Sequence, residues 1–296
     1  MSRNLQLLVA LSACLALAGC QEAPNPVANL RVAPAQLGLP FPHYQAVEIT
    51  IDMVEPIEAA PVPWVMVHLL DLSGSVVRTF DHPLPDEWVP GQSQSYTIDL
   101  YQSALAPPLD PGVYQLSAGL YDAAGNRWAL LTEGEQVHRL EYAVGAVEVL
   151  QGAGSAPKFL FSPTWMATEA GTDVQILGRR WLRSEGAIRL ESVATEGTVR
   201  LDLRIEAPDP QLEDLVLDEG FNRVQLDVAT TCGEETWSLT GVGTHVLEIP
   251  VGQLTENEPA DGCEISLTPH YRVVTRRNLN SRALALDLLA WRPQGS

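Results

Sequence analysis

Short runs of alternating apolar and polar residues, most of them ended by a turn signal, recur along most of this 296-residue chain. Residues 47–53 alternate strictly, which is the period of a strand with one buried and one solvated face. Residues 64–70 are apolar on both faces, so we expect a central strand, and residues 71–74 then turn into a hairpin partner at 76–80. Several short strands of this kind, with no helix-period segment among them, predict an antiparallel β-sandwich over residues 30–149.

The second half continues the β pattern and predicts a second antiparallel sandwich over residues 158–296. Residues 187–191 and 199–206 alternate cleanly, with arginines and acids interleaved on what we expect to be a solvated sheet face. Between the two halves, residues 150–157 are mostly small and uncharged before Pro157, which is typical of an interdomain linker. The fold class predicted from the sequence is therefore all-β, with two domains.

The last strong apolar run, residues 283–291, is the one segment for which helix and strand compete. Its alanines and leucines suit a helix by propensity. The strict alternation through Leu284, Leu286 and Leu288 favours a strand, which is the interpretation we adopt.

Spaced motifs in the first half indicate a known module. They are Val67-His68-Leu69-Leu70-Asp71 with Gly74, Trp88 with Pro90-Gly91, Pro111-Gly112-Val113-Tyr114, and Gly119-Leu120-Tyr121-Asp122 with Gly125. Through them residues 60–132 resemble an Ig-like extracytoplasmic β-sandwich that is appended to bacterial membrane-bound glycosyltransferases and occurs in surface lipoproteins. The resemblance implies an Ig-like fold and an extracytoplasmic setting, and it transfers no catalytic residue.

The second half resembles a jelly-roll or galactose-binding-like sandwich, which accompanies the first module in some glycosyltransferase-linked proteins. The features that carry this resemblance are Glu169, Gly178-Arg179-Arg180-Trp181 and residues 282–286. They cover only scattered segments of the half.

The first 19 residues have the marks of a secretory signal: Arg3, an apolar-to-neutral run over residues 5–18, and small residues before a cut. The run is too short for a membrane-spanning helix of roughly 20 residues. Leu17-Ala18-Gly19-Cys20 resembles the bacterial lipobox, which implies cleavage after residue 19 and lipidation of Cys20. The alternative is an ordinary secretory signal with an incidental cysteine.

If Cys20 is the mature amino terminus, residues 20–29 form a polar, proline-bearing tether to the first domain. Gln21 stands where the lipoprotein resemblance would place an aspartate for inner-membrane retention, so we expect the outer membrane of a bacterial envelope. The formal net charge is −19, and removal of Arg3 with the signal makes it −20. A surface this acidic repels nucleic acid and anionic headgroups, so the lipid is the expected attachment to the membrane.

Two cysteines, Cys232 and Cys263, remain in the expected mature chain besides Cys20. In an oxidising compartment their natural pairing is a disulfide. The competing metal site is disfavoured because no histidine lies near either cysteine at ligand spacing.

Aromatic residues are the candidate ligand-binding groups. Flat sugar rings stack on aromatic faces beside polar side chains, and Trp165 and Trp181 lie in sequence near Arg180 and Glu169. These four residues are the candidate site, with Trp181 as its leading member. The alternative is that the tryptophans fill the sandwich core.

Catalytic and metal motifs are missing from the sequence: it contains no Gly-x-Ser-x-Gly, no His-Glu-x-x-His and no phosphate-binding glycine loop. His68 falls inside the expected central strand, where a structural histidine is the favoured interpretation. The turns at Asp71 and Asp122 lack the dense acidic loop of a calcium site. We therefore expect no catalytic residue, no metal and no cofactor.

These observations together predict a non-catalytic lipoprotein of the bacterial envelope whose two sandwiches bind or scaffold. Its expected partners are the membrane, through the lipid, and either a polysaccharide or an envelope protein, but no nucleic acid. A structural or protein-interaction subunit of an envelope assembly is the alternative. An unrecognised hydrolase is the least favoured, and it would need a cleft with two convergent carboxylates or a His–Ser pair.

Overall fold

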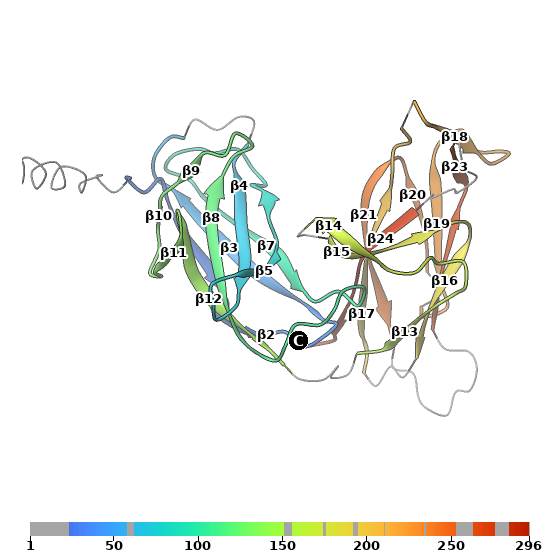
Figure 1. Cartoon of the computed structure of the whole chain (residues 1–296), viewed down its shortest axis with the longest axis horizontal. Helices are drawn as coiled ribbons and strands as arrows, with labels where there is room; N and C mark the ends of the chain where they lie inside the picture. The colour runs from blue at the N-terminus through green and yellow to red at the C-terminus, as the bar shows by residue number, and fades with distance from the viewer. Residues whose placement is uncertain are drawn as a thin grey trace, which may run out of the picture.

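Every secondary-structure element that the computed structural model describes is a β-strand, and the strands form two sandwiches (Figure 1). The described residues are 24–57, 62–150, 156–173, 176–191, 195–209, 211–233, 235–252, 263–275 and 284–295. The predicted all-β class with two antiparallel sandwiches is confirmed. The predicted signal, residues 1–19, and Cys20 lie outside the described residues. Within the described part, no helix is long and apolar enough to span a membrane.

The first sandwich packs a four-stranded sheet against a larger one. The four-stranded sheet has the order β10 (Leu130–Leu131), β1 (Ala28–Ala33), β3 (Tyr44–Met53), β7 (Ser93–Tyr101). The larger sheet has the order β11 (Gln136–His138), β12 (Glu141–Val149), β8 (Gly112–Tyr121), β4 (Trp64–Leu70), β5 (Val76–Thr79), with β2 (Gln36–Gly38), β6 (His82–Pro83) and β9 (Arg127–Trp128) at its margins.

The strand predictions for this half follow the burial that the structure shows. β3 alternates buried and more exposed residues, and β4 lies inside its sheet between β8 and β5. The hairpin from β4 to β5 forms as predicted, with His68 opposite Thr79. The tether is shorter than predicted: β1 begins at Ala28 rather than at residue 30, and Val27 is already buried.

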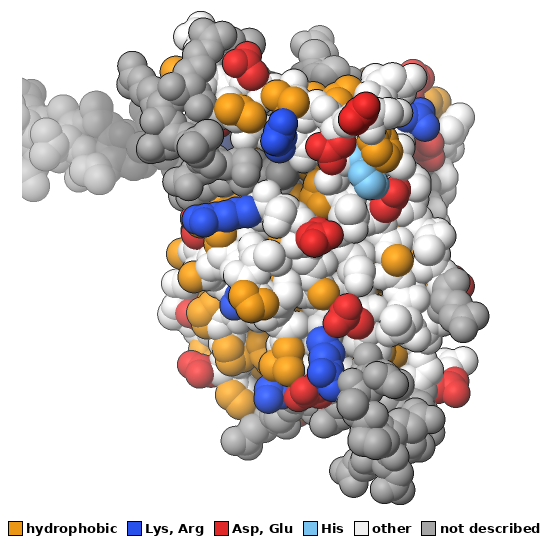
Figure 2. Space-filling model, turned by 90° about the vertical axis from the view of Figure 1, so that its right-hand side faces the viewer, with side chains coloured by type: hydrophobic (Ala, Val, Ile, Leu, Met, Phe, Trp, Pro, Cys, Tyr) orange, Lys and Arg blue, Asp and Glu red, His pale blue; other side chains and the backbone are white. Residues whose placement is uncertain are grey.

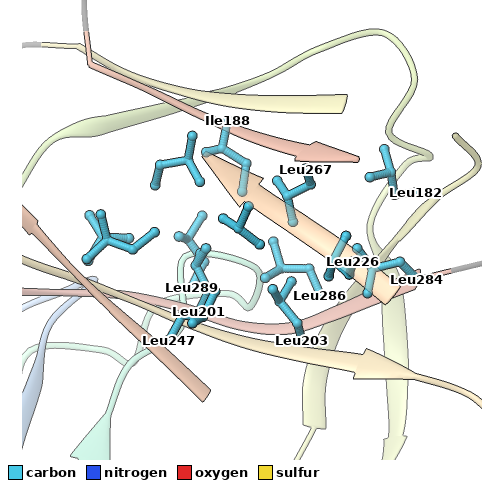
Figure 3. Close-up of a cluster of buried hydrophobic side chains, with 14 of the residues drawn as sticks. Leu182, Ile188, Leu201, Leu203, Leu226, Leu247, Leu267, Leu284, Leu286 and Leu289 are labelled. Atoms are coloured by element: carbon cyan, nitrogen blue, oxygen red, sulfur yellow. The ribbon is translucent and has the colours of Figure 1, made fainter. Parts of the chain in front are cut away.

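The second sandwich packs two five-stranded sheets around a leucine-rich core (Figure 3). One sheet has the order β13 (Lys158–Phe161), β16 (Gly186–Glu191), β22 (Glu264–Pro269), β19 (Gln225–Thr230), β20 (Thr236–Thr240). The other has the order β14 (Glu169–Asp173), β15 (Ile176–Leu182), β24 (Leu284–Pro293), β17 (Gly197–Ile205), β21 (Gly243–Val251). β18 (Glu213–Leu217) pairs separately with β23 (Tyr271–Thr275).

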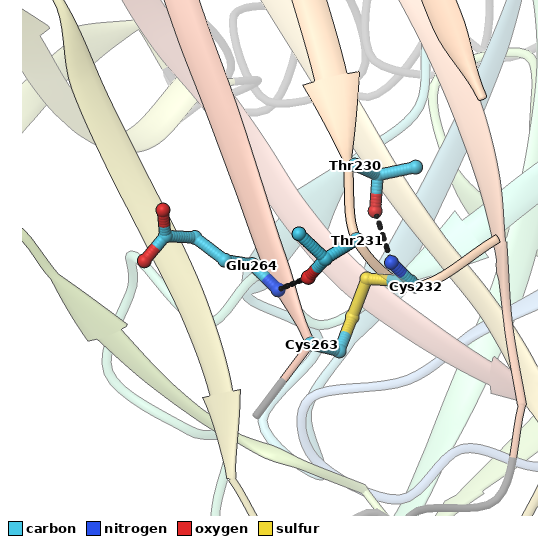
Figure 4. The surroundings of a disulfide bond; sticks show 5 residues. All are labelled: Thr230, Thr231, Cys232, Cys263 and Glu264. Atoms are coloured by element: carbon cyan, nitrogen blue, oxygen red, sulfur yellow. Dashed lines mark hydrogen bonds between the residues drawn. A yellow bond between two sulfur atoms is a disulfide. The ribbon is translucent and has the colours of Figure 1, made fainter. Parts of the chain in front are cut away.

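Cys232 and Cys263 are joined in a disulfide, the pairing that the sequence predicts, with their Cα atoms 4.7 Å apart (Figure 4). The bond links the segment after β19 to the start of β22. Backbone N–H groups on both sides donate to threonine hydroxyls: that of Cys232 to Thr230 and that of Glu264 to Thr231, each at 2.9 Å. The crosslink therefore closes the end of two strands that already pair.

The run over residues 283–291 forms a strand in its described part, as the alternation predicts, and both faces of that strand are buried. On the inner face of β24, Leu286 and Trp291 belong to the sandwich core. On the outer face, Leu288 and Ala290 form a small apolar cluster with Tyr44 of the first sandwich. A strand buried on both faces explains why the run contains so few polar residues.

The first sandwich also completes the edge of β24. Among the described residues, β15 pairs with β24 only at Leu284–Leu286. Further along, the N–H of Ala104 donates to the Leu289 carbonyl at 2.7 Å, and the N–H of Trp291 donates to the Pro42 carbonyl at 2.9 Å. Backbone from the first sandwich thus satisfies polar groups of β24 that β15 leaves open.

We call this junction the joint. It comprises residues 42–44 and 99–105 of the first sandwich, together with the parts of β15, β17, β21 and β24 of the second sandwich that they contact. Leu105 is 6% exposed and belongs to the core of the second sandwich. Its carbonyl lies so close to the backbone of Gly178 on β15 that a Cβ at Gly178 would overlap it. The two sandwiches are thus interlocked as well as connected through the predicted linker.

We expect Leu105→Ala to lower the free energy of unfolding by about 2–4 kcal/mol, because it opens a cavity in the core of a domain to which the residue does not belong in sequence. Urea denaturation should also split from one transition toward two. Leu131→Ala is the matched control: this leucine is 60% exposed, and we expect a change within about 0.5 kcal/mol. Equal effects of the two substitutions would contradict the interlock.

Candidate functional site

The four candidate ligand-binding residues lie in one region of the second sandwich, with both indoles buried. Trp165 is 6% exposed and Trp181 is 4% exposed. The Trp165 Nε1 donates to the Ala187 carbonyl at 3.1 Å, and the Trp181 Nε1 donates to Glu169 Oε2 at 3.1 Å. Neither ring presents an open face, so the predicted stacking of a sugar on these tryptophans has no geometric support.

The arginines of this region cover aromatic faces themselves. The Arg180 guanidinium lies 4.1 Å from the ring centroid of Phe161, and its Nε donates to Thr168 Oγ1 at 2.9 Å. The Arg179 guanidinium lies 5.2 Å from the centroid of Trp181. Both indoles are buried, and the arginines add cation–π contacts to Trp181 and to Phe161, which agrees with the alternative that the tryptophans fill the sandwich core.

A second polar cluster lies on the outer face of the larger sheet of the first sandwich. His68 Nδ1 contacts Glu141 Oε1 at 2.9 Å, and His68 Nε2 contacts Asp81 Oδ1 at 3.3 Å. The Ser117 hydroxyl donates to Glu141 Oε1 at 2.6 Å, and Tyr121 donates to Asp81 Oδ2 at 3.2 Å. His68 therefore bridges the Glu141 carboxylate of β12 and the Asp81 carboxylate of the segment between β5 and β6, in keeping with the structural role that we favoured.

This cluster contains a serine, a histidine and a carboxylate, but their order differs from that of a nucleophile and its base. Nucleophilic catalysis needs the hydroxyl to donate to a ring nitrogen. Here the Ser117 hydroxyl donates to Glu141, both ring nitrogens of His68 face carboxylates, and Ser117 is fully buried. The geometry favours a structural network.

The charges in this network support one another. Burial lowers the pKa of His68, but the hydrogen bonds to Asp81 and Glu141 outweigh it and raise the pKa to about 9. Burial raises the pKa of Glu141, but the hydrogen bonds from His68 and Ser117 outweigh it and hold the pKa below its usual range. At neutral pH the cluster is therefore a histidinium held between carboxylates.

We expect stability to fall as the pH rises through about 9. The pKa of His68 is higher in the folded protein than its ordinary value of 6.5, so its stabilisation is complete below pH 6.5 and is lost as the histidine deprotonates near pH 9. His68→Asn should lower the free energy of unfolding by about 2–3 kcal/mol at pH 6, and this difference should shrink toward pH 10. Urea unfolding across this range measures both, and an NMR titration midpoint of the His68 ring below pH 7 would contradict the assignment.

A third polar region lies at the joint and replaces the solvated face that we expected for residues 199–206. Arg200 forms an ion pair with Asp99 of β7 and donates from Nε to Asp202 Oδ1 at 2.9 Å. Both carboxylate side chains are 18% exposed and that of Arg200 is 15% exposed. The expectation of a solvated face is wrong here, because β17 turns these charges toward the first sandwich.

Tyr44 ties the same face together from the first sandwich. Its hydroxyl donates to Glu248 Oε1 at 3.3 Å, and the Arg292 guanidinium lies 4.7 Å from its ring centroid. Arg292 also pairs with Glu248 Oε2 at 3.4 Å. The joint thus combines backbone hydrogen bonds, an apolar cluster and a layer of charges.

An open pocket of about 330 Å³ adjoins the joint between the two sandwiches. Its lining includes Asp81, His82, Asp99, Tyr101, Arg200 and Asp202. Burial raises the pKa of Asp99, against the opposing effect of Arg200, and burial lowers the pKa of His82. The pocket brings carboxylates, which accept hydrogen bonds, close to the Arg200 guanidinium, which donates them. Such a mixture of donors and acceptors suits a hydroxyl-rich ligand.

The sequence contained a signal for the joint that we did not use. The apolar run of β24 has no polar face, and the alternating arginines and acids of β17 include unlike charges two residues apart. Taken alone, the apolar run of β24 is ordinary for a core strand, and the alternating charges of β17 are ordinary for a strand with a solvated face. Which strand of the first sandwich would face them could not be derived from the sequence, since nothing in the alternation points to Asp99.

We expect Asp99→Asn to lower the free energy of unfolding by about 1–3 kcal/mol, because Arg200 loses a charged partner in a half-buried setting. The exchanged pair Asp99→Arg with Arg200→Asp should recover part of the loss. Glu191→Gln is the control: it breaks the exposed pair with Lys158 at 3.8 Å, and should cost less than about 1 kcal/mol. An Asp99→Asn effect no larger than this control would contradict a role for the pair in the joint.

Comparison with known proteins assigns no family to the chain. No family model and no curated protein matches it. The crystal structure of CBD12 from CALX1.2 is similar over 83% of this chain and 79% of that one, at 12% identity and a TM-score of 0.22. The crystal structure of tripeptidyl peptidase 2 covers 88% of this chain and 20% of that one, at 11% identity and a TM-score of 0.20. Likenesses this weak support no statement about function.

Proposed function

We propose that this chain is an exported, lipid-anchored, non-catalytic protein of the bacterial envelope that acts as a binding or scaffold module. The joint carries this proposal. Backbone hydrogen bonds to β24, Leu105 in the second core and the Arg200–Asp99 pair hold two sandwiches in one fixed arrangement. A fixed arrangement of two binding domains suits scaffolding and presentation of a ligand between them, whereas a flexible linker alone would leave the domains independent.

The envelope setting rests on the resemblance of residues 17–20 to a lipobox, on the net charge of −20 after cleavage and on the disulfide. An acidic surface without a lipid would keep the protein away from anionic headgroups. In lipoproteins of this kind the cysteine thiol is diacylated and the new amino terminus is acylated, which supplies at least the two signals that stable anchoring requires.

A polysaccharide is the ligand that we propose for the pocket beside the joint. The buried tryptophans leave stacking unsupported, so recognition would be polar. Asp202 and Asp81 can accept hydrogen bonds from sugar hydroxyls, and Arg200 can donate to them. A pocket that is open to solvent can accommodate a chain that continues beyond the bound unit.

An exposed strand favours a protein partner as the second candidate. β21 spans nine residues, is paired with β17 along one edge, and lies at the end of its sheet among the described strands. Val246 on this strand is 52% exposed. Long edge strands of this kind are templates for pairing with another chain. Crosslinking in intact cells should then give discrete heteromeric products rather than a lone monomer.

In Figure 2, which shows the molecule from the right-hand side of Figure 1, charged side chains are scattered among apolar ones.

The anchor is tested by Cys20→Ser, which removes the thiol that would carry the lipid and leaves the described fold untouched. We expect the wild-type protein in the membrane fraction and the variant in the aqueous fraction, with the same circular dichroism spectrum. A variant that stays with the membrane would contradict lipid anchoring.

Polysaccharide binding should be measured with residues 21–296, because a fragment limited to residues 158–296 lacks Leu105 and with it part of its own core. We expect Asp202→Asn to reduce retention on a polysaccharide array at least tenfold, and Glu191→Gln to leave retention unchanged. This result would support the pocket as the polysaccharide-binding site. Failure of the wild-type protein to be retained on any envelope polysaccharide would remove this part of the proposal and leave the protein partner.

A further inference from the structure

Exposed apolar side chains gather where the chain enters the first sandwich. Val54 is 56% exposed, Val89 is 36% exposed and Leu131 is 60% exposed. Val54 bonds to Val27, the residue just before β1, while Leu131 pairs with Asn29 and Val89 lies beside Met53, the β3 residue opposite Ala28. We call Val54, Val89 and Leu131 the entry surface.

Backbone contacts fix the entry surface around the incoming chain. Val27 donates to the Ala129 carbonyl at 2.9 Å and accepts from the N–H groups of Val54 and Glu55 at 2.8 and 3.0 Å. The β10 pairing then places Leu131 beside Asn29, and the N–H of Val89 lies 3.2 Å from the sulfur of Met53. The segments that carry Val54, Val89 and Leu131 therefore lie beside the entering chain or beside Met53, the strand residue that pairs with Ala28.

The entry surface and the joint lie at opposite ends of the first sandwich. β3 runs from Tyr44 at the joint to Met53 beside Val54, and ten strand residues span roughly 30 Å. Figure 1 shows the chain entering at the end of the first sandwich that lies away from the second.

We propose that the entry surface rests on the lipid bilayer, an inference that depends on the proposed lipid anchor at Cys20. Only residues 21–26 separate Cys20 from Val27, so the fully extended chain reaches at most roughly 25 Å. The anchor therefore keeps this end close to the membrane, where its apolar side chains find an apolar neighbour. The joint and the second sandwich then project outward.

The charges around the entry surface specify the kind of bilayer. Glu55, Asp86 and Glu87 are exposed near Val54 and Val89. Anionic headgroups would repel them, whereas zwitterionic headgroups would not. The entry surface therefore fits a bilayer whose headgroups are mainly zwitterionic. Trp88 lies at the margin of the entry surface, and its indole N–H donates to the Glu55 carbonyl at 2.9 Å.

The test places a fluorescent label at single cysteines in the lipidated protein on phosphatidylcholine vesicles that contain a spin-labelled quencher lipid. Val54→Cys and Val89→Cys probe the entry surface. Val113→Cys is the matched control, because this valine is 58% exposed and lies on β8 toward the opposite end of the same sandwich. Labelling without reductant keeps the Cys232–Cys263 disulfide intact, so the introduced thiol is the reactive one.

We expect quenching at positions 54 and 89 to exceed that at position 113 at least twofold, and to weaken when phosphatidylglycerol replaces part of the phosphatidylcholine. Val54→Asp should reduce quenching of the label at position 89, and Val113→Asp should leave it unchanged. Equal quenching at all three positions in protein that floats with the vesicles would overturn the proposed orientation and leave the anchor standing. Lipidated protein that does not float with the vesicles would overturn the anchor itself, and with it this inference.

Discussion

The unfinished edge of β24 is the constraint on which the arrangement of this molecule depends. β17 covers one edge of the strand throughout, but β15 covers only its first residues, so backbone groups near Leu289 and Trp291 would be left unpaired in the sandwich core. An unpaired buried N–H or carbonyl costs about as much as a lost hydrogen bond. The first sandwich supplies the missing partners through Ala104 and Pro42, so the second domain is complete only in its presence.

The apolar and charged contacts of the joint follow from this backbone pairing. Once Pro42 and Ala104 are fixed against β24, Tyr44 must lie over Leu288 and Ala290, and Leu105 must enter the second core. Arg200 then faces Asp99 across the boundary. Leu105 and Tyr44 add apolar contacts to this pairing, and the Arg200–Asp99 ion pair, with side chains 15% and 18% exposed, adds a largely buried electrostatic contact. Together they make the orientation part of the fold.

Local patterns predicted the strands well, since a strand's period depends only on which of its faces is buried. Alternation identified β3, the doubly apolar run identified β4 as central, and the leucine spacing of β24 decided correctly between strand and helix. The same patterns could not say what buries a face. A tryptophan near an arginine in sequence fits either a sugar site or a buried core cluster, so Trp181 was predicted to bind a ligand. The burial of its ring and the packing of Arg179 over it distinguish the two. Arg200 looked solvated for the same reason.

β3 connects the joint to the entry surface. One strand carries Tyr44, which holds the second sandwich, at one end, and Met53, which packs beside the incoming tether, at the other. A strand hydrogen-bonded on both sides is stiff along its length, so an orientation imposed at the tether is transmitted to the joint without an intervening hinge. The pocket between the sandwiches would then be held at a defined height above the bilayer, roughly the 30 Å length of the strand. A second sandwich attached only by its linker could not hold a ligand at such a fixed distance.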